Sequence, residues 1–151
     1  MSATRVISFE KVDQKYLSGG LVDPIAKIFK EYKTIAVVGA SDNPARPSNQ
    51  VATYLQHQGF RVIPVNPRLA RVHGETCYPD LLSIPESIDV VDIFRNPAFV
   101  SEIVEQAITK QVKVVWMQPG AENHPAAQRA EQAGLQVVMS LCMMTAHPGI
   151  D

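Results

Sequence analysis

The chain has 151 residues, of which 46% are hydrophobic and 19% are charged, and its formal net charge is −1. This length and composition are typical of one globular domain, which buries roughly 70% of its surface on folding. The 14 basic and 15 acidic residues include no run of lysine or arginine, which argues against a surface for nucleic acid or for an anionic membrane.

The first residues do not have the features of a targeting segment. They lack the apolar core of a signal peptide, and no stretch approaches the ~20 apolar residues of a membrane span. We therefore expect a cytoplasmic protein without membrane association. Cys77 and Cys142 form no CxxC motif and the four histidines are scattered, so we expect neither a disulfide framework nor a metal site.

We interpret residues 1–22 as an N-terminal arm that contains a turn at its SGG sequence, followed by a single domain over residues 23–151. Asp23 and Pro24 suit the N-cap and the first position of a helix. A short helix over residues 24–32 would place three apolar side chains on one face, those of Ile25, Ile28 and Phe29.

From residue 34 onward the chain alternates strand-like and helix-like segments. Residues 34–39 are small or β-branched apolar residues, which is typical of a strand covered on both faces. A helix over residues 49–58 would end at Gly59, a natural C-cap. Residues 60–66 predict a second strand. Pro64 within it donates no ladder hydrogen bond, so the neighbour on that side must be short or absent.

The second half of the chain continues the alternation. Residues 75–78 predict a short strand, and residues 88–94 a longer one. Asn96 and Pro97 would begin a helix whose apolar residues recur at the spacing of a face packed on a sheet. The remaining predicted elements are a strand over residues 112–117, a helix over 125–133 closed by Gly134, and a last strand over 135–139.

This alternation predicts a single Rossmann-like α/β domain. Right-handed crossovers would give a doubly wound, mostly parallel sheet of five to six strands. Ligands of such sheets bind beyond the C-terminal ends of the strands, near the point where the strand order reverses. Small and polar residues follow five of the predicted strands, so we expect a ligand site at this edge.

The loop after the first predicted strand has features of a phosphate site. Gly39 permits a tight turn, Ser41 offers a hydroxyl, and Arg46 can form a charge-assisted bond to a phosphate. A helix that begins near Ser48 would direct its first N–H groups at an anion. The alternative is that Gly39 and Pro47 only shape a connection between strand and helix.

The end of the second strand discriminates among nucleotides. NAD-binding domains place an acidic residue there for the ribose 2′-OH, whereas this chain has Asn66 and then Arg68. A cation favours a ribose that bears a phosphate, either the 2′-phosphate of NADP or the 3′-phosphate of coenzyme A. The alternative for Arg68 is a solvated surface arginine.

Five motifs in order carry a resemblance to a known family: IAVVGASDNPARPSNQV, VNPR, FRNP, MQPG and SLC. In these motifs the chain resembles the stand-alone coenzyme A-binding proteins. These are Rossmann-like domains similar to the N-terminal CoA-binding domain of the succinyl-CoA synthetase α subunit. The resemblance runs from about residue 34 to residue 147 and therefore covers most of the domain predicted over residues 23–151.

The resemblance implies that coenzyme A, or an acyl-CoA, lies extended across the strand ends. The residues it assigns are Gly39, Ala40 and Ser41, with Arg46 or Ser48, for the pyrophosphate; Asn66, Pro67 and Arg68 for the 3′-phosphoribose; Phe94 and Arg95 for the adenine; Gln118 for the pantetheine arm; and Cys142, a position that family members often fill with cysteine.

No catalytic constellation accompanies these residues. In the synthetase α subunit the catalytic histidine lies in a second domain, and we expect no such domain here. We also find no Ser-His-Asp set or paired carboxylates at one strand end. Asp89 and Asp92 flank the fourth strand, and we expect them in the crevice wall or in solvent. The leading hypothesis is a CoA-binding module without catalysis of its own, in a regulatory or carrier role.

Two alternatives remain open. One is an NADP-dependent enzyme in which Arg68 binds the 2′-phosphate, although a GxGxxG motif is missing. The other is a redox protein in which Cys142 forms a mixed disulfide with the pantetheine thiol. The alternative for Cys142 is an unreactive cysteine that only contributes to packing. The sequence does not specify whether the chain binds a protein partner or forms a homo-oligomer. A protein partner would contact the first 33 residues.

Overall fold

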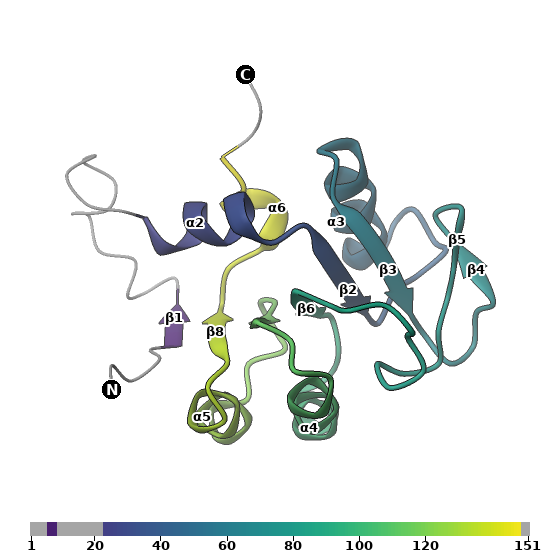
Figure 1. Ribbon diagram of the computed structural model, residues 1–151. Helices are drawn as coiled ribbons and strands as arrows, with labels where there is room; N and C mark the ends of the chain where they lie inside the picture. Colours follow the sequence, from purple (N-terminus) through teal and green to yellow (C-terminus); the bar gives the residue numbers. More distant parts are fainter. Residues whose placement is uncertain (1–5, 9–22, 149–151) are drawn as a thin grey trace.

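A parallel β-sheet forms the middle layer of the molecule (Figure 1). The computed structural model describes residues 6–8 and 23–148. Within these residues, six strands lie in the order β1-β8-β7-β6-β2-β3, and all neighbours run parallel. The predicted α/β fold, with a mostly parallel sheet of five to six strands, is confirmed. The strands are β1 (Val6–Ser8), β2 (Thr34–Val38), β3 (Arg61–Val65), β6 (Val90–Ile93), β7 (Val114–Met117) and β8 (Gln136–Met139).

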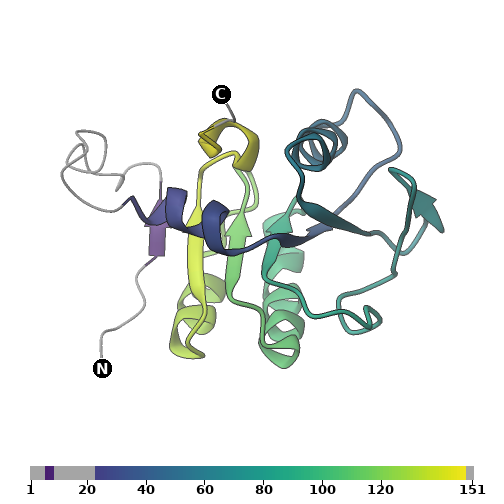
Figure 2. The same cartoon turned by 45° about the horizontal axis from the view of Figure 1, so that its top comes forward.

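Helices cover both faces of the sheet (Figures 1 and 2). The side chains of β2 explain why: Ile35 and Val37 are buried on one face, and Ala36 and Val38 on the other. A strand buried on both sides needs apolar residues at every position. Helices α4 (Val100–Lys110) and α5 (His124–Gln132) cover one face, and α2 (Pro24–Glu31), α3 (Pro47–His57) and α6 (Met143–Ala146) cover the other.

Side-chain caps start three of the helical segments. The Asp23 carboxylate accepts a hydrogen bond from the Ile25 N–H at 2.9 Å, which confirms the predicted start of α2. Asn96 does the same for the short 3-10 helix η2 (Pro97–Phe99) ahead of α4, and Asn123 for α5. The predicted apolar face of α2 is buried, as Ile25, Ile28 and Phe29. None of the described helices is long and apolar enough to span a membrane.

The strand β1 was not predicted. Val6–Ser8 fall in the segment interpreted as an arm, yet they pair in parallel with Val137, Val138 and Met139 of β8. Three residues are too few to show a periodic pattern, and their partner lies at the far end of the chain. The turn expected at the SGG sequence lies outside the described residues.

The strand β3 lies at the edge of the sheet, as its proline predicted. Pro64 pairs with Val37 of β2, and on the other side of β3 the described residues form a single bridge, between Val65 and Tyr78. The Tyr78 N–H donates to the Pro64 carbonyl at 3.0 Å, a contact that needs no N–H from the proline. The short strand predicted over residues 75–78 is present as β5 (Glu75–Thr76), which pairs with β4 (Arg71–Val72) in an antiparallel hairpin that was not predicted.

The strand order reverses between β2 and β6. The chain moves from β2 to β3 on one side, returns to β6 on the other side of β2, and then continues outward through β7 and β8. The connections after β2 and β6 lead to helices on opposite faces of the sheet, α3 on one face and α4 on the other, and a crevice forms at the C-terminal ends of these strands.

Candidate functional site

Two cavities open at this edge of the sheet, and they share Gly39, Asn66 and Arg95. We name them after one residue of each. The Arg68 cavity has a volume of about 550 Å³ and is lined by residues that include Pro67, Arg68, Asp80, Phe99 and Glu102. The Cys142 cavity has a volume of about 710 Å³ and is lined by residues that include Ala40, Ser41, Arg46, Ser48, Phe94, Gln118 and Cys142. All the site residues expected from the sequence thus line one crevice.

Gly39 brings two loops into contact. Its φ is +91°, and a Cβ atom at this position would overlap with the carbonyl oxygen of Phe94 and lie 3.0 Å from its carbonyl carbon. Only glycine combines this conformation with such an approach. The N–H groups of Gly39 and Ala40 both donate to the Val65 carbonyl, at 3.0 and 3.1 Å. These two amides therefore tie β2 to β3 rather than point at a ligand.

The loop that follows is held by its own polar groups. The Ser41 hydroxyl accepts a hydrogen bond from the Asn43 N–H at 3.0 Å, and Asn49 Nδ2 donates to the Ser41 carbonyl at 2.8 Å. Helix α3 begins at Pro47 with Arg46 as its N-cap, and no side chain of the described residues makes a cap bond to it. Ser48, in the first turn, is buried and lines the Cys142 cavity. Pro47 has no N–H, and the N–H groups of Arg46 and Asn49 donate to the carbonyls of Asn43 and Arg46 at 3.0 and 3.1 Å. Of the N–H groups of residues 46–49, that of Ser48 is therefore the one placed to meet an anion.

The side chain of Asn66 connects two loops of the crevice by hydrogen bonds. Its Nδ2 donates to the Ala40 carbonyl at 2.7 Å, and its Oδ1 accepts a hydrogen bond from the Arg68 N–H at 2.8 Å. The side chain expected to face a ligand therefore joins the loops after β2 and β3. Arg68 and Pro67 are exposed at the rim.

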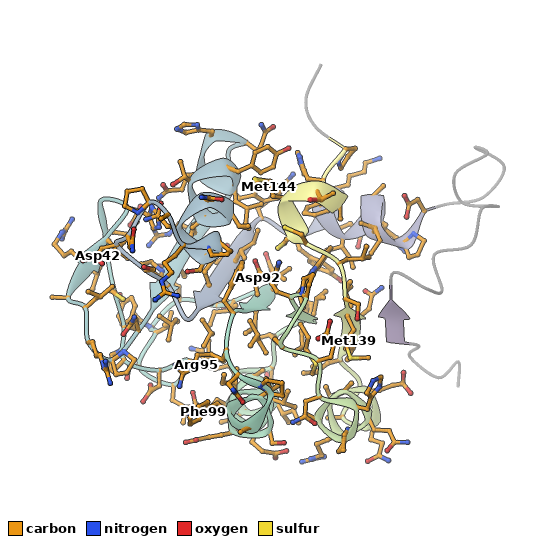
Figure 3. All side chains as sticks on the ribbon, turned by 180° about the vertical axis from the view of Figure 1, so that it is seen from behind. Asp42, Asp92, Arg95, Phe99, Met139 and Met144 are labelled. Atoms are coloured by element: carbon orange, nitrogen blue, oxygen red, sulfur yellow. The ribbon has the colours of Figure 1, made fainter. Side chains whose placement is uncertain are left out.

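The aromatic side chain of the Arg68 cavity is Phe99, not Phe94. Phe99 is 49% exposed, and the Arg95 guanidinium lies 4.3 Å from the centre of its ring. Both residues lie beside α4 in Figure 3. Phe94, which was expected beside Arg95 at the adenine, lines the other cavity. Phe99 could have been identified from the sequence, because it is a large aromatic residue at the start of a helix and does not belong to the apolar face of α4.

The Cys142 cavity ends at a thiol held by polar groups. Cys142 is the N-cap of α6, a helix that was not predicted from the sequence. Gln118 is buried, and its Oε1 accepts a hydrogen bond from the Met143 N–H at 3.0 Å. Burial acts to raise the pKa of Cys142, but hydrogen bonds from Thr145, Gln118 and the Met144 amide together lower it below the ordinary value of a cysteine.

Two hydrogen bonds fix the loop before Cys142, one to the main chain of Leu141 and one from the side chain of Ser140. The buried indole of Trp116 donates through Nε1 to the Leu141 carbonyl at 2.8 Å. Ser140 adopts a left-handed conformation with φ of 65°, and its hydroxyl donates to Glu122 at 2.9 Å. Left-handed backbone at a non-glycine residue costs energy that the surrounding contacts must supply.

Asp92 lies in the core, where the sequence did not predict it. It was expected in the crevice wall or in solvent, but its side chain is fully buried in β6. Neither carboxyl oxygen has a hydrogen-bond partner within the described part of the chain. Burial raises the pKa of Asp92 well above its ordinary value, and the negative charge of Cys142 raises it further. Asp89, at the other end of the strand, accepts from the N–H groups of Lys33 and Thr34.

In residues 6–8 and 23–148, no group of three or more His, Cys, Asp or Glu side chains is placed to hold an ion. The residues that line the two cavities include three arginines, the exposed ring of Phe99, Cys142, and the acidic residues Asp80 and Glu102.

Comparisons with known proteins show the family to which the chain belongs. The sequence model of a family described as a CoA binding domain matches residues 33–148. An uncharacterized protein of Bacillus subtilis, YneT, is 36% identical over 123 residues, which are 82% of this chain and 91% of that protein. The α subunit of an ADP-forming acetate–CoA ligase II of Pyrococcus furiosus is 35% identical over 130 residues, 78% of this chain but 28% of that subunit. A solved structure, of a hypothetical protein from Pyrococcus horikoshii, is 42% identical with a TM-score of 0.83, over 97% of this chain and 96% of that one.

Proposed function

Because the chain belongs to the family of CoA binding domains, we propose that it binds coenzyme A, or an acyl-CoA, across both cavities of the crevice. The observation that carries the proposal is the chemical difference between the two ends. One end presents arginines and an aromatic ring, and the other ends at a thiol. Coenzyme A has the matching polarity, with a phosphorylated nucleoside at one end and a thiol at the other. Each cavity falls in the usual size range of ligand pockets, roughly 300–1,000 Å³.

The adenosine end would occupy the Arg68 cavity. Arg68 and Arg95 supply positive charge for the 3′-phosphate, and Phe99 supplies a ring on which the adenine can stack. In this arrangement Arg95 leaves or shares its position over Phe99 when the base arrives. Asn66 acts by fixing the main chain of Arg68 rather than by contact with the ligand.

The pyrophosphate would lie at the start of α3. Arg46 and Ser48 line the Cys142 cavity there, and the helix start adds the Ser48 N–H and its dipole. Gly39 and Ala40 contribute to this site by shape, since their N–H groups are bonded to Val65. The pantetheine arm would then run past Gln118 toward Cys142.

The chain is similar to only a part of a larger enzyme, which supports a role in ligand binding rather than in a complete catalytic reaction. The chain aligns with 28% of the Pyrococcus furiosus ligase subunit, whereas it aligns with 91% of the uncharacterized Bacillus subtilis protein. We propose that this chain binds its ligand without catalysis of its own, as a carrier or regulatory module. Turnover of acetyl-CoA by the purified chain would contradict this part of the proposal.

A thermal-shift panel of coenzyme A, acetyl-CoA, dephospho-CoA, NAD and NADP tests the ligand. A ligand at 100 times its dissociation constant adds about 2.7 kcal/mol of stability, or roughly 5–10 °C for a domain of this size. We expect shifts with coenzyme A and acetyl-CoA, and a smaller shift with dephospho-CoA. A shift with NADP alone would overturn the proposal in favour of an NADP-dependent protein. The single tryptophan, Trp116, gives a second readout because it is bonded to Leu141 beside Cys142.

A second candidate function is redox chemistry at Cys142. The observation that favours it is the lowered pKa of this thiol, which hydrogen bonds produce against the effect of burial. Its thiolate would attack a disulfide that contains the coenzyme A thiol, form a mixed disulfide, and release the other thiol. Incubation with coenzyme A disulfide followed by peptide mass spectrometry tests this. An adduct on Cys142 that dithiothreitol removes supports the candidate, and an unmodified Cys142 rejects it.

A further inference from the structure

The side chain of Glu122 joins the two loops that form the thiol end of the Cys142 cavity. Glu122 lies in the loop between β7 and α5, and its Oε1 accepts a hydrogen bond from the Gly120 N–H at 2.8 Å. Its Oε2 accepts a hydrogen bond at 2.9 Å from the hydroxyl of Ser140, the first residue after β8. One carboxylate therefore holds its own loop in shape and ties it to the loop that leads to Cys142.

Glu122 acts from behind the wall of the cavity. The lining of the Cys142 cavity on this side consists of Gln118, Pro119, Gly120, Ala121 and Cys142. The lining thus takes residues from both of the loops that are joined, but neither Glu122 nor Ser140 belongs to it. A ligand in the cavity would therefore touch the two loops and not the carboxylate that holds them together.

The segment that ends at α6 is also held by two side chains from the end of β7. The buried Trp116 donates through Nε1 to the Leu141 carbonyl at 2.8 Å, and the buried Gln118 accepts from the Met143 N–H at 3.0 Å. The main chain is thus bonded on both sides of Cys142. The end of the cavity has a fixed shape before any ligand arrives.

The backbone of Ser140 indicates that its hydroxyl has a use. Its φ is 65°, in the left-handed region that glycine adopts without strain and that costs energy for a serine. The Ser140 N–H donates to the Met117 carbonyl at 3.1 Å, a bond that glycine would make equally well. The bond to Glu122 needs the hydroxyl. This bond is therefore what a serine adds at a position that favours glycine.

We propose that Glu122 is a positioning residue for the thiol end of the ligand. Its carboxylate keeps the loop of residues 118–121 and the loop before Cys142 at a fixed separation, so that the pantetheine arm meets a surface that is already formed. A preformed surface avoids the entropic cost of ordering two loops when the ligand binds. This role rests on the proposed binding of coenzyme A. Because Glu122 does not line the Arg68 cavity, the adenosine end of the ligand should not depend on it.

Titration calorimetry with two fragments of coenzyme A separates this role from a general effect on the fold. Glu122→Ala should weaken the binding of phosphopantetheine and of coenzyme A by roughly tenfold, which corresponds to one hydrogen bond to a charged group. The affinity for adenosine 3′,5′-bisphosphate should not change. Glu105→Ala is the control, because the Glu105 carboxylate also joins two elements, α4 and α5, through Arg129 at 3.0 and 3.2 Å. It should leave all three affinities unchanged. Equal affinities of the wild type and Glu122→Ala for phosphopantetheine would overturn the proposal.

Two further variants separate the effect of the hydrogen bonds from that of stability. Glu122→Gln should restore most of the affinity, because a glutamine can accept from the Gly120 N–H and donate to the Ser140 hydroxyl. Ser140→Gly removes the hydroxyl but suits the left-handed backbone. It should therefore resist urea better than Ser140→Ala and still lose as much affinity for phosphopantetheine. Wild-type affinity in Ser140→Gly would overturn the proposal.

The fluorescence of Trp116 gives a readout that needs no ligand. Trp116 is the single tryptophan of the chain, and it is bonded to Leu141, next to Ser140. Its emission should change in Glu122→Ala and stay as in the wild type in Glu105→Ala. Unchanged emission in Glu122→Ala would mean that the loop keeps its place without the carboxylate, which would also overturn the proposal.

The proposed function and the role of Glu122 fail in different ways. If the wild type binds neither coenzyme A nor its fragments, the proposed function is wrong, and the role of Glu122 falls with it. If the wild type binds them and Glu122→Ala binds phosphopantetheine equally well, only the role of Glu122 is wrong.

Discussion

Gly39 and Phe94 meet so closely that a side chain at Gly39 would overlap with the main-chain carbonyl of Phe94. The contact lies where the strand order reverses, between the ends of β2 and β6. Gly39 also lines both cavities, so the contact lies where the two cavities join.

Gly39→Ala should destabilise the fold and weaken coenzyme A binding. Alanine would adopt a left-handed conformation at a cost of about 1–3 kcal/mol, and it would also push the two loops apart. Gly59→Ala is the matched control, because Gly59 has the same φ of +91° and a Cβ atom there would meet nothing within 4 Å. Urea unfolding of both variants should show a larger loss for Gly39→Ala. Equal losses in the free energy of unfolding would mean that the close approach of Gly39 to Phe94 does not contribute to stability.

Arg68→Ala should lower the affinity for coenzyme A and leave that for dephospho-CoA unchanged. A charge-assisted hydrogen bond to the 3′-phosphate contributes about 1.5–3 kcal/mol, which is roughly tenfold to a hundredfold in the dissociation constant. Titration calorimetry with both ligands measures this difference. Arg71→Ala is the control, since Arg71 is also exposed but bonds to the Gly74 carbonyl in the β4–β5 hairpin. Equal losses for both ligands would place the 3′-phosphate elsewhere.

Phe99→Ala should reduce coenzyme A affinity with little effect on folding. Stacking of a base on an aromatic ring contributes about 1–3 kcal/mol, whereas an exposed side chain usually changes stability by no more than about 0.5 kcal/mol. Leu82→Ala is the control, because Leu82 is also a large exposed apolar residue, at 52% exposure, and its loss should change neither quantity. Phosphopantetheine, which lacks the adenine, should bind wild type and Phe99→Ala equally. A loss for this fragment too would contradict a role in stacking the base.

Asp92→Asn should become more stabilising as pH rises. The pKa of Asp92 is raised in the folded state by burial, so the folded protein holds this proton more tightly than the unfolded chain does. This contribution to stability is complete below the unfolded pKa, near 3.9, and is lost as pH rises toward the folded value. The free energy of unfolding of Asp92→Asn minus that of wild type should therefore grow by about 1.4 kcal/mol per pH unit above about pH 4. Urea unfolding at several pH values measures it, and a constant difference would contradict the raised pKa.

The alternation of strands and helices was predictable because each signal was local. Apolar stretches such as that of β2 are buried on both faces, and Asp23 and Asn96 cap the helical segments that they precede. The two short elements, β1 and α6, were not predictable, since three and four residues have no period to recognise. They exist through contacts with distant parts of the chain.

The position of the site was predictable, but the tasks of its residues were not. The sequence places Gly39, Asn66 and Cys142 after parallel strands, which brings them to one edge of the sheet. It does not reveal that the amide of Asn66 is used by Ala40 and Arg68, or that Phe99 rather than Phe94 faces the Arg68 cavity. Both depend on distances between elements that are remote in the chain.

The pairing of β1 with β8 imposes an order on assembly. The pairs β2–β3, β2–β6, β6–β7 and β7–β8 can form in turn as the chain leaves the ribosome, because each needs only strands already made. Val6–Ser8 are synthesised before all of them and yet must wait for Gln136–Met139. The first described strand to emerge is therefore the last to find its place, and until Val6–Ser8 pair with β8, the edge of β8 is open to other chains.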